Sequence, residues 1–501
     1  MTPSRDATVS GYQLTEVGVS LICVDEALDK LQELYQNVSN LPQPVGRQKE
    51  VLCLQAHGHH VVLGTAGSGK TTLALLRALY LSDCKTDHGG KTLLVTFSKC
   101  LVAYLHGLAD VDHRYVDIRN YHHFARGYLS SRKKMRYNSI CGPDTTRSLC
   151  DKVLADKRHS NSSIELLKKP VEFFVEEFEW MAKNGITTLE EYASATRVGR
   201  AEFRVQRSER PLVFELQQEY LKERSSINKD YDWHDLGLAV LMELSQDSST
   251  RMYRHVIIDE GQDLSPMEIR SLAAAVATNG SLTFFGDVAQ QIYGRRVSWR
   301  KAGLDISHVW NFEENYRNTR SIADLALALA NKHFNSEADI VVPKSPTADG
   351  PKPSLVKFSD PKQEMAYVVK LAKQYGAIGT VAVLFRSREQ EAAFSAAIRS
   401  PTTRLHRDLG LWPDGNGIFH GTFHAAKGLE FDSVVIPHLS SQLFPDQDEV
   451  KIYGEPEAIA DDARLLYVGI TRARMNLVLT FTGNPSSVIP HTKSLYDIAI
   501  R

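Results

Sequence analysis

A glycine-rich run at residues 64–71 constrains this chain more than any other feature. The run reads GTAGSGKT and fits the pattern GxxxxGK[ST]; it follows the apolar run 60–63 and precedes the helix-like stretch 72–81. In that context the glycines let backbone N–H groups turn inward around phosphate oxygens, and the start of the helix adds its positive dipole. Lys70 is expected to reach the terminal phosphates and Thr71 to offer its hydroxyl to Mg²⁺. The residues predicted to hold a nucleotide here are Gly64, Thr65, Ala66, Gly67, Ser68, Gly69, Lys70, Thr71 and Thr72.

Two adjacent carboxylates supply the second half of such a site. Asp259 and Glu260 directly follow the apolar run 256–258. At the end of a buried strand one carboxylate can hold Mg²⁺ while the next deprotonates or orients a water molecule, and hydrolysis of a nucleoside triphosphate needs both roles. By itself an Asp-Glu pair is more often a surface turn. With the phosphate-binding loop upstream, we interpret Asp259 as the metal ligand and Glu260 as the catalytic carboxylate.

Short apolar runs bounded by polar or glycine residues recur in two sets, with helix-like stretches such as 363–373 and 388–398 nearby. This pattern is typical of buried parallel strands. The runs are 60–63, 93–97, 256–258 and 282–285 in the first set, and 381–385, 418–422, 434–436 and 477–481 in the second. We therefore expect two α/β domains whose ligands lie outside the carboxyl ends of the strands, with the two sheets facing each other across a ligand.

A stretch at residues 126–229 between the runs of the first set is too long for a loop and is predicted to be helical. Within it arginines recur every three or four residues, a spacing that would align them on one helical face. They are Arg197, Arg200, Arg204, Arg207 and Arg210. Two interpretations stay open, a solvated face paired with acidic neighbours and a stripe that contacts a phosphate backbone.

The charge balance limits how the chain could bind a nucleic acid. With 59 Lys+Arg against 60 Asp+Glu the net charge is -1, so binding would be local, in a basic groove. The charge-free stretches 51–69 and 475–492 are broken by polar or helix-breaking residues, and no membrane span is expected. The beginning of the chain lacks the apolar segment of a secretory signal. We expect a cytoplasmic protein of two to four domains, at roughly 100 to 200 residues each.

Further short motifs follow one another in a set order. They are Gln48 ahead of the loop, LVTFSK at 94–99, NYHHF at 120–124, YDWHDL at 231–236, DEGQD at 259–263, GDVAQQIY at 286–293, ENYRNT at 314–319, TFHAAKGLEF at 422–431 and YVGITRAR at 467–474. Each motif alone is weak, but their order is specific. In kind and order they resemble the superfamily 1A DNA helicases of the UvrD/Rep/PcrA type, over about residues 48–125 and from residue 230 onward.

The resemblance implies an α/β fold of two RecA-like P-loop domains with parallel sheets. Domain 1A would comprise 46–125 and 230–309, a mainly helical 1B-like insertion 126–229, and domain 2A 310–501, with 1–45 as an N-terminal extension of unknown function. The family's large 2B insertion cannot fit into the about 30 residues between Arg386 and Gly417, so 2B is expected to be absent or vestigial. Unwinding of long duplexes is then expected to be poor or to need a partner. The about 27 residues after Arg474 leave no room for a nuclease domain, so we expect any cleavage to belong to another chain.

The resemblance also implies nucleotide roles for residues of both domains. Gln48 would read the adenine, Tyr316 would lie against it, and Glu430 would touch the ribose. Gln290 would sense the γ-phosphate, and Arg317 and Arg472 would act on it as arginine fingers. Together with Lys70 and Glu260, the three residues Gln290, Arg317 and Arg472 form the predicted catalytic set, and ATP and Mg²⁺ are the predicted cofactors.

A second group of residues is implied in binding a single strand. They are Phe97, Tyr121, His122, Tyr293, Arg296, Thr422 and His424. For Phe97 and Tyr121 the alternative of core aromatics stays open, because aromatic residues at strand ends often simply pack. Arg295 stands where the family has a Trp, which puts the stepping along bases in doubt, since a guanidinium stacks less rigidly than an aromatic ring.

The leading hypothesis is a motor that translocates 3' to 5' along single-stranded DNA, with RNA left open as the alternative strand. The rival is a DNA-stimulated ATPase that senses DNA and regulates a partner nuclease without processive unwinding. In its compact architecture the chain resembles the helicase subunit of Gabija-type phage-defence systems, where such a nuclease exists. A small-molecule P-loop kinase is disfavoured, because it would need neither ENYRNT nor YVGITRAR.

Overall fold

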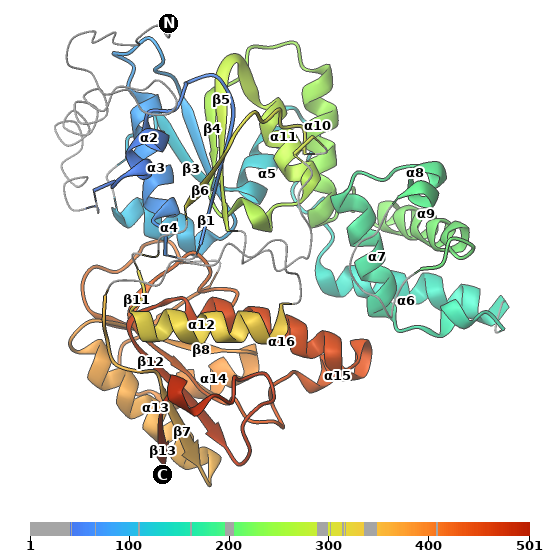
Figure 1. The fold of residues 1–501 in the computed structure, drawn as a ribbon. Helices are drawn as coiled ribbons and strands as arrows, with labels where there is room; N and C mark the ends of the chain where they lie inside the picture. The colour runs from blue at the N-terminus through green and yellow to red at the C-terminus, as the bar shows by residue number, and fades with distance from the viewer. Residues whose placement is uncertain are drawn as a thin grey trace, which may run out of the picture.

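The computed structural model describes residues 41, 43–65, 67–108, 111–160, 163–195, 205–287, 299–300, 302–312, 315, 317–334, 348–406 and 409–501. Two α/β lobes lie one above the other, and a helical module projects beside the upper lobe (Figure 1). Each lobe is built on a parallel sheet. This is the α/β class with two RecA-like sheets that the sequence predicts.

The first lobe has a six-stranded sheet in the order β3-β2-β4-β5-β1-β6, and every paired strand is parallel to its neighbour. Its strands are β1 (Gly58–Gly64), β2 (Thr92–Thr96), β3 (Val116–Asn120), β4 (Tyr253–Ile258), β5 (Val276–Asp287) and β6 (Val309–Phe312). Because the strands are parallel, their carboxyl ends share one edge of the sheet. The segments that follow β1, β2, β4 and β5 are therefore brought together there.

Helices cover both faces of the first sheet. One face carries α2 (Arg47–Leu52), α3 (Lys70–Ser82) and α4 (Lys99–Leu108), and the other carries α5 (Tyr121–Ser131), α10 (Leu236–Gln246) and α11 (Pro266–Ala274) (Figure 1). Two apolar cores result, one on each face. Strand β2 (TLLVT) is buried at every position because both of its faces are covered, which explains its continuous apolar sequence. The single turns η3 (Trp233–Asp235) and η4 (Gly261–Asp263) precede α10 and follow β4.

The second lobe has a seven-stranded sheet in the order β13-β7-β12-β11-β8-β10-β9, again parallel throughout. Its strands are β7 (Ser354–Phe358), β8 (Thr380–Phe385), β9 (Thr403–Arg404), β10 (Gly417–Thr422), β11 (Phe431–Ile436), β12 (Ala473–Thr482) and β13 (Asp497–Ile500). Its helices are α12 (Arg320–His333), α13 (Pro361–Gly376), α14 (Arg388–Ala397), α15 (Gln447–Tyr453) and α16 (Glu455–Ile470), with the turn η5 (Lys493–Leu495). The apolar core on the α12 and α16 side is continuous with the α2–α4 core of the first lobe.

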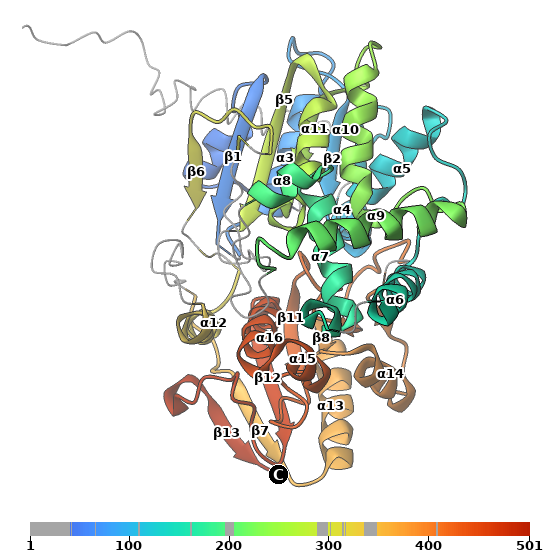
Figure 2. The same ribbon diagram turned by 90° about the vertical axis from the view of Figure 1, so that its right-hand side faces the viewer.

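The helical module has a core of its own. It consists of α6 (Pro143–Ser160), η2 (Glu165–Lys168), α7 (Val171–Lys183), α8 (Leu189–Ser194) and α9 (Arg210–Ser226), and it faces the viewer in Figure 2. Buried Arg224 pairs with Asp232 at 2.6 Å and with Asp235 at 2.5 Å, which joins the module to the first lobe. Arg210 donates to the carbonyls of Tyr192 and Ala193 within the module, at 2.6 and 2.8 Å.

The predicted arginine stripe therefore does not extend through α9. Residues 197, 200 and 204 lie outside the described residues. Arg207 lies in the turn before α9, and Arg210 is the first residue of that helix. The Arg210 guanidinium is engaged with backbone carbonyls within the module, which neither of the two interpretations predicts.

All eight apolar runs lie largely or wholly within strands. Five strands carry no such run: the interior strand β7, and four others that share one physical reason. Strands β3, β6, β9 and β13 are the edges of the two sheets. Edge strands are short and carry polar residues, as in the sequence VDIRN of β3, so their apolar signal is weak.

Between β8 and β10, the described residues form only α14 and β9 as regular elements, in line with the expected lack of a 2B domain. No helix in the described part of the chain is both long and apolar enough to span a bilayer.

Fully buried Arg77 on α3 ties the first lobe together behind the phosphate-binding loop. Its Nε donates to Thr283 Oγ1 on β5 at 2.8 Å, and its Nη1 donates to the carbonyls of Leu52 and Leu54 at 2.9 and 3.1 Å. The Leu52 carbonyl is at the end of α2 and the Leu54 carbonyl lies just beyond it, where no further helical turn supplies N–H donors. Burial lowers the pKa of Arg77 to about 10, which leaves it charged at neutral pH.

We expect Arg77→Met to lower the free energy of unfolding by about 3 to 5 kcal/mol, because the buried carbonyls lose their donors. The urea midpoint followed by circular dichroism measures this. Arg114→Met is the matched control: the Arg114 side chain is 80% exposed and pairs with Asp112 at the surface, so no measurable change is expected. Equal midpoints for the two variants would contradict the role of Arg77.

Candidate functional site

The phosphate-binding loop joins the end of β1 to the start of α3. Gly67 and Gly69 have φ values of 81° and 80°, in the left-handed region that favours glycine. Lys70 Nζ donates to the carbonyls of Gly64 and Thr65 at 2.9 and 2.7 Å, so the ammonium lies inside the arc of the loop. It also lies 3.8 Å from the carboxylate of Asp287 at the end of β5. The loop and its cation are thus arranged as phosphate binding requires.

Gln48 contacts the loop directly. Its Nε2 donates to the carbonyl of Ser68 at 2.7 Å, and its Oε1 accepts from the backbone N–H of Val45 at 3.0 Å. The side-chain amide therefore joins the segment before α2 to the phosphate-binding loop. The sequence predicts a role in reading adenine, and the structure adds this contact with the loop backbone.

The carboxylate of Asp259 follows β4 and is almost completely buried. Neither of its oxygens has a hydrogen-bond partner of good geometry within the described part of the chain, although the Thr71 hydroxyl and the Glu260 N–H lie close enough to lower its pKa. Burial raises the pKa of Asp259 and the charge of Glu260 adds to this, while Thr71 and Lys70 act in the opposite direction. A buried carboxylate without partners is costly unless a cation joins it. Asp259 and the nearby Thr71 hydroxyl therefore fit a Mg²⁺ ion, which favours oxygen ligands.

Glu260 is held in an uncommon backbone conformation, with φ 53° and ψ 39°. A non-glycine residue in the left-handed region stores strain, which is frequent at functional sites. Gln262 Nε2 donates to Glu260 Oε2 at 2.5 Å, and Gln262 Oε1 accepts from the backbone N–H of Asp287 at 2.9 Å. Gln262 thus orients the catalytic candidate and ties it to β5. We did not single out Gln262 from the sequence, although it lies within the DEGQD motif.

The second lobe contributes two arginines. Arg317 Nε donates to Glu430 Oε2 at 2.6 Å, which pairs two residues predicted at opposite parts of the nucleotide. Arg472 is 1% exposed, and its Nε and Nη1 donate to the carbonyls of Val468 and Leu429 at 3.1 and 3.2 Å. Burial, followed by the charge of Arg317, lowers the pKa of Arg472 to about 10. Both guanidinium groups are therefore fixed by the second lobe and remain cationic at neutral pH.

The two lobes meet at this site. Burial by itself would raise the pKa of Glu260, but the charges of Lys70, Arg472 and Lys427 outweigh burial and lower it. The first of these cations belongs to the first lobe and the other two to the second. A Cβ atom added at Gly67 would lie 2.8 Å from Arg317 Cβ, so the phosphate-binding loop touches the second lobe. Lys70 and Arg472 thus share one crevice.

A buried ion pair also crosses the crevice. Lys427, from the segment between β10 and β11, donates to the carboxylate of Asp263 in the turn after Glu260. Both side chains are nearly inaccessible. Burial raises the pKa of Asp263 to about 6, although Lys427 favours its charged form. The pair joins the acidic segment of the first lobe to the TFHAAKGLEF segment of the second.

Several predicted positions lie outside the described residues. They are Ala66, Gln290, Tyr293, Arg295, Arg296 and Tyr316. Their predicted roles stay predictions. The remaining predicted nucleotide residues are described: Gln48 lies in α2, Gly64, Thr65, Gly67, Ser68 and Gly69 at the end of β1 and in the loop, Lys70, Thr71 and Thr72 at the start of α3, Asp259 and Glu260 after β4, and Arg317, Glu430 and Arg472 in the second lobe.

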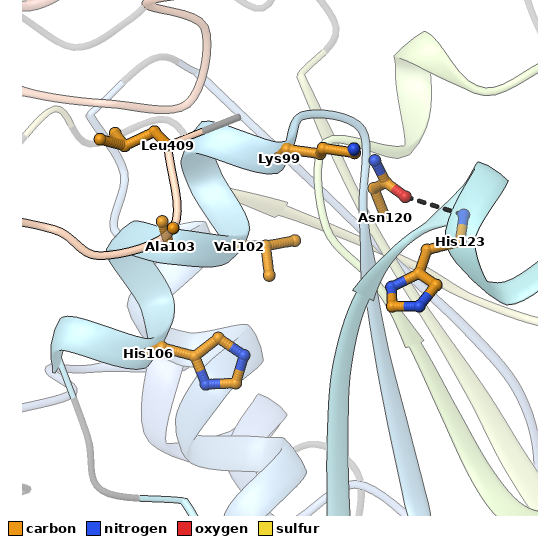
Figure 3. Close-up of a pocket in the computed structure, with 8 residues that line it drawn as sticks. Lys99, Val102, Ala103, His106, Asn120, His123 and Leu409 are labelled. Atoms are coloured by element: carbon orange, nitrogen blue, oxygen red, sulfur yellow. Dashed lines mark hydrogen bonds between the residues drawn. The ribbon is translucent and has the colours of Figure 1, made fainter. Parts of the chain in front are cut away.

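A pocket of about 230 Å³ lies beside α4, where the predicted strand path begins (Figure 3). It is bordered by Lys99 and His106 of α4, by Asn120 and His123 at the β3–α5 junction, and by the segment 409–410 of the second lobe. Asn120 Oδ1 accepts from the His123 N–H at 2.8 Å and so caps α5. The pocket therefore combines polar groups of the first lobe with Leu409 and Gly410 of the second.

The predicted strand residues differ in their access to solvent. Phe97 is 40% exposed at the end of β2, and His424 is exposed. His122 and Thr422 are partly buried; His122 lies 3.7 Å from Glu268 and packs against the Trp233 ring at 4.9 Å. These four positions are accessible in part to a ligand.

The predicted contact of Tyr121 with the single strand is wrong. It is 2% exposed, and its hydroxyl bonds with Ser271 Oγ at 2.7 Å across to α11. Because the ring packs in the core between α5 and the sheet, it offers no surface to a nucleic acid. The core alternative is therefore the right one for Tyr121.

The fold and site together define a two-lobed P-loop protein in which Arg317 and Arg472 of the second lobe lie near Glu260 of the first. The family model of the UvrD/REP helicase N-terminal domain matches residues 46–317, and that of the UvrD-like helicase C-terminal domain matches 310–403 and 413–484. The chain therefore belongs to the UvrD/Rep-type superfamily 1 helicases, and it is an ATP-hydrolysing DNA helicase enzyme.

Curated relatives agree with this assignment. The chain is 24% identical over 555 residues to the ATP-dependent DNA helicase UvrD2 of Mycobacterium tuberculosis, which covers 87% of this chain and 78% of the relative. It is 24% identical over 456 residues to a probable DNA helicase of Mycoplasma pneumoniae, covering 84% and 80%. DNA helicase IV of Escherichia coli is 29% identical over 262 residues, covering 48% of this chain and 36% of the relative.

We expect Gly67→Ala to lower kcat/KM for ATP by about 10²-fold, because a misplaced phosphate loop or arginine disrupts the reacting geometry. The added Cβ would lie 2.2 Å from Asn315 Oδ1 as well as against Arg317, so the lobes could not close as they do here. Steady-state ATP hydrolysis measures the effect. Gly58→Ala in the same β1–loop unit is the control, since it has a similar φ of 79° but nothing within 4 Å of its added Cβ. If both variants lose activity alike, backbone strain rather than the lobe contact is responsible.

Proposed function

We propose that this enzyme couples ATP hydrolysis between its two lobes to 3' to 5' movement along single-stranded DNA. The observation that carries the proposal is the position of Glu260 among cations from both lobes. A catalytic carboxylate in that position works best when the lobes are together, so hydrolysis is tied to their relative movement. DNA as the strand is supported by the names of the relatives, and the direction by the resemblance of the motifs.

The residues of the first lobe hold the nucleotide and prepare the attacking water. Lys70 binds the terminal phosphates, and Gln48 supports the loop beside the base. Thr71 and Asp259 hold Mg²⁺, which, when bound, neutralises charge on the phosphate oxygens. Glu260 orients the water and accepts its proton; the low pKa imposed by the three cations keeps it ionised for this role. Gln290 is proposed to sense the γ-phosphate from the same lobe.

The residues of the second lobe stabilise the charge that develops on the transferred group. Arg317 and Arg472 supply that positive charge, and such arginines contribute about 10³- to 10⁵-fold in rate. Arg317 is paired with Glu430 through its Nε at 2.6 Å, so its two terminal nitrogens would meet the phosphate while Glu430 holds the guanidinium. Tyr316 is proposed to lie against the adenine and Glu430 to touch the ribose.

The ion pair between Lys427 and Asp263 connects the nucleotide site to the proposed strand contacts. The segment of Lys427 also carries Thr422 and His424, which are proposed to contact the strand. Opening of the crevice after hydrolysis would break this pair and displace those residues relative to Phe97 and His122 on the first lobe. Each lobe then holds the strand in turn, and the strand advances by one step for each ATP that is hydrolysed. Tyr293 and Arg296 are proposed as further strand contacts.

A second candidate function is a DNA-stimulated ATPase that acts as the sensor or regulatory subunit of a nuclease complex. The short connection between β8 and β10, with α14 and β9 as its regular elements among the described residues, favours keeping this candidate. Without a 2B domain the chain is expected to unwind long duplexes poorly. ATP hydrolysis would then signal to the partner that DNA is bound, and would not separate the DNA strands.

Two assays on the full chain distinguish these candidates. ATP hydrolysis is measured with and without single-stranded DNA or RNA, and strand displacement on a duplex with a 3' tail and on one with a 5' tail. A motor of the proposed direction displaces from the 3' tail; stimulation without displacement selects the sensor. Lys70→Ala is expected to abolish turnover in both assays, because the terminal phosphates lose their cation. Normal turnover in Lys70→Ala would refute the site.

We expect Arg472→Ala to lower kcat by about 10³-fold while the Kd of a non-hydrolysable ATP analogue changes less than about threefold. The reason is that this guanidinium acts on the transition state and the phosphate loop provides most of the binding. Because Arg472 is buried, the thermal midpoint is compared in parallel, and Arg472→Lys serves where the alanine variant is unstable. A variant that hydrolyses ATP at the normal rate would remove Arg472 from the site.

A further inference from the structure

Helix α4 belongs to the first lobe, yet one of its faces packs on the second lobe. Residues 100, 101, 104 and 107 lie on this face at helical spacing, while 99, 102, 103 and 106 line the pocket of Figure 3. Cys100 Sγ lies 3.2 Å from the carbonyl oxygen of His406. A Cβ at Gly428 would lie 2.6 Å from Leu101 Cδ2, so the backbone of the second lobe approaches α4 closely.

Trp412 is the centre of this contact. Its ring is stacked on Phe419 of β10, with centroids 4.9 Å apart and an interplanar angle of 16°. The same ring meets Tyr104 of α4 edge-on, at 5.2 Å and 78°. A Cβ at Gly107 would lie 3.2 Å from Trp412 Cβ. Trp412 is therefore fixed on β10, next to the edge strand β9 of the second sheet, and holds the ring of Tyr104 from the opposite lobe.

The hydroxyl of Tyr104 continues the chain of contacts to the nucleotide crevice. It donates to Glu430 Oε1 at 3.4 Å, while Arg317 Nε donates to Glu430 Oε2 at 2.6 Å. The two oxygens of one carboxylate are thus bound from different lobes. The torsion that turns a glutamate carboxylate is soft, so a single partner leaves its plane poorly defined, whereas partners on both oxygens fix it.

We propose that Tyr104, held by Trp412, is a positioning residue for Arg317: it fixes the Glu430 carboxylate across the seam between the lobes and thereby orients the arginine. Because Tyr104 comes from the first lobe and Glu430 from the second, the hydrogen bond exists only when the lobes are together. The arginine is therefore aligned in the closed arrangement and released from this constraint when the crevice opens.

Tyr104, Arg317 and Glu430 lie within the segments that match the family models, whereas Trp412 does not. The family match in the second lobe stops at residue 403 and resumes at 413, which leaves Trp412 outside it. The segment 409–416 lies in the short connection before β10. In place of a large insertion, the connection supplies one aromatic residue that clamps α4.

The inference rests on the proposed role of Arg317 in hydrolysis, and Tyr104→Phe tests it on the full chain. The variant keeps the ring against Trp412 and removes the hydroxyl. We expect kcat for ATP to fall about three- to tenfold, with KM and the Kd of a non-hydrolysable analogue within twofold, because a charge-assisted hydrogen bond is lost without loss of nucleotide contacts. An unchanged kcat, or a change in KM alone, overturns the proposal.

Coupling to Glu430 separates positioning from general packing. If Tyr104 acts through this carboxylate, Tyr104→Phe combined with Glu430→Gln should be no slower than Glu430→Gln alone. Additive losses overturn the proposal. Trp412→Ala should reduce kcat in the same way and Trp412→Phe should restore most of it. Leu411→Ala is the matched control, because Leu411 is the neighbouring residue and is 85% exposed; it should behave as the wild type.

Hydrogen exchange of the nucleotide-free protein gives a readout that does not depend on turnover. Trp412→Ala should speed amide exchange in α4 relative to Leu411→Ala, since the clamp on that helix is lost. Unchanged amide exchange in α4 of the Trp412→Ala variant overturns the proposed role of Trp412 in holding that helix. A wild-type chain that hydrolyses no ATP would refute the proposed function, whereas active wild type with an equally active Tyr104→Phe variant would refute only this inference.

Discussion

The burial of one carboxylate between cations of two lobes is the constraint on which the site depends. Glu260 is nearly inaccessible, and burial acting alone would raise its pKa. Lys70 from one lobe and Arg472 and Lys427 from the other keep it ionised. The lowered pKa of Glu260, which its proposed role as a base needs, is therefore a property of the assembled lobes. Separation of the lobes would remove two of the three cations, and this is how the proposed function links hydrolysis to domain movement.

Parallel sheet topology explains why the residues of this site are distant in the sequence yet adjacent in space. In each lobe the strands end at one edge, and the chemistry lies in the segments after those ends. The loop after β1, the acidic pair after β4 and Asp287 at the end of β5 meet in this way. Helices on both faces bury the strands, so the edge is held rigidly.

The seam between the lobes combines apolar packing with a few directed polar contacts. The continuous core on the α2–α4 side and close approaches at Gly67 and Gly428 bring the lobes into register. The Lys427–Asp263 pair and the Tyr104–Glu430 hydrogen bond lie on this apolar background. Because α4 also borders the pocket of Figure 3, a single helix touches both the nucleotide crevice and the proposed strand path.

The sequence by itself determined the phosphate-binding loop, the eight principal strands and the order of the helicase motifs, because each depends on residues that are close along the chain. It could not reveal that Tyr121 faces the core, since similarity of a motif does not state which way a side chain points. It also could not find the Tyr104–Glu430 or Lys427–Asp263 contacts, which join segments 326 and 164 residues apart. Those pairings, and with them the geometry around Glu260, are decided only when the two sheets pack against each other, because no local pattern encodes which surfaces will meet.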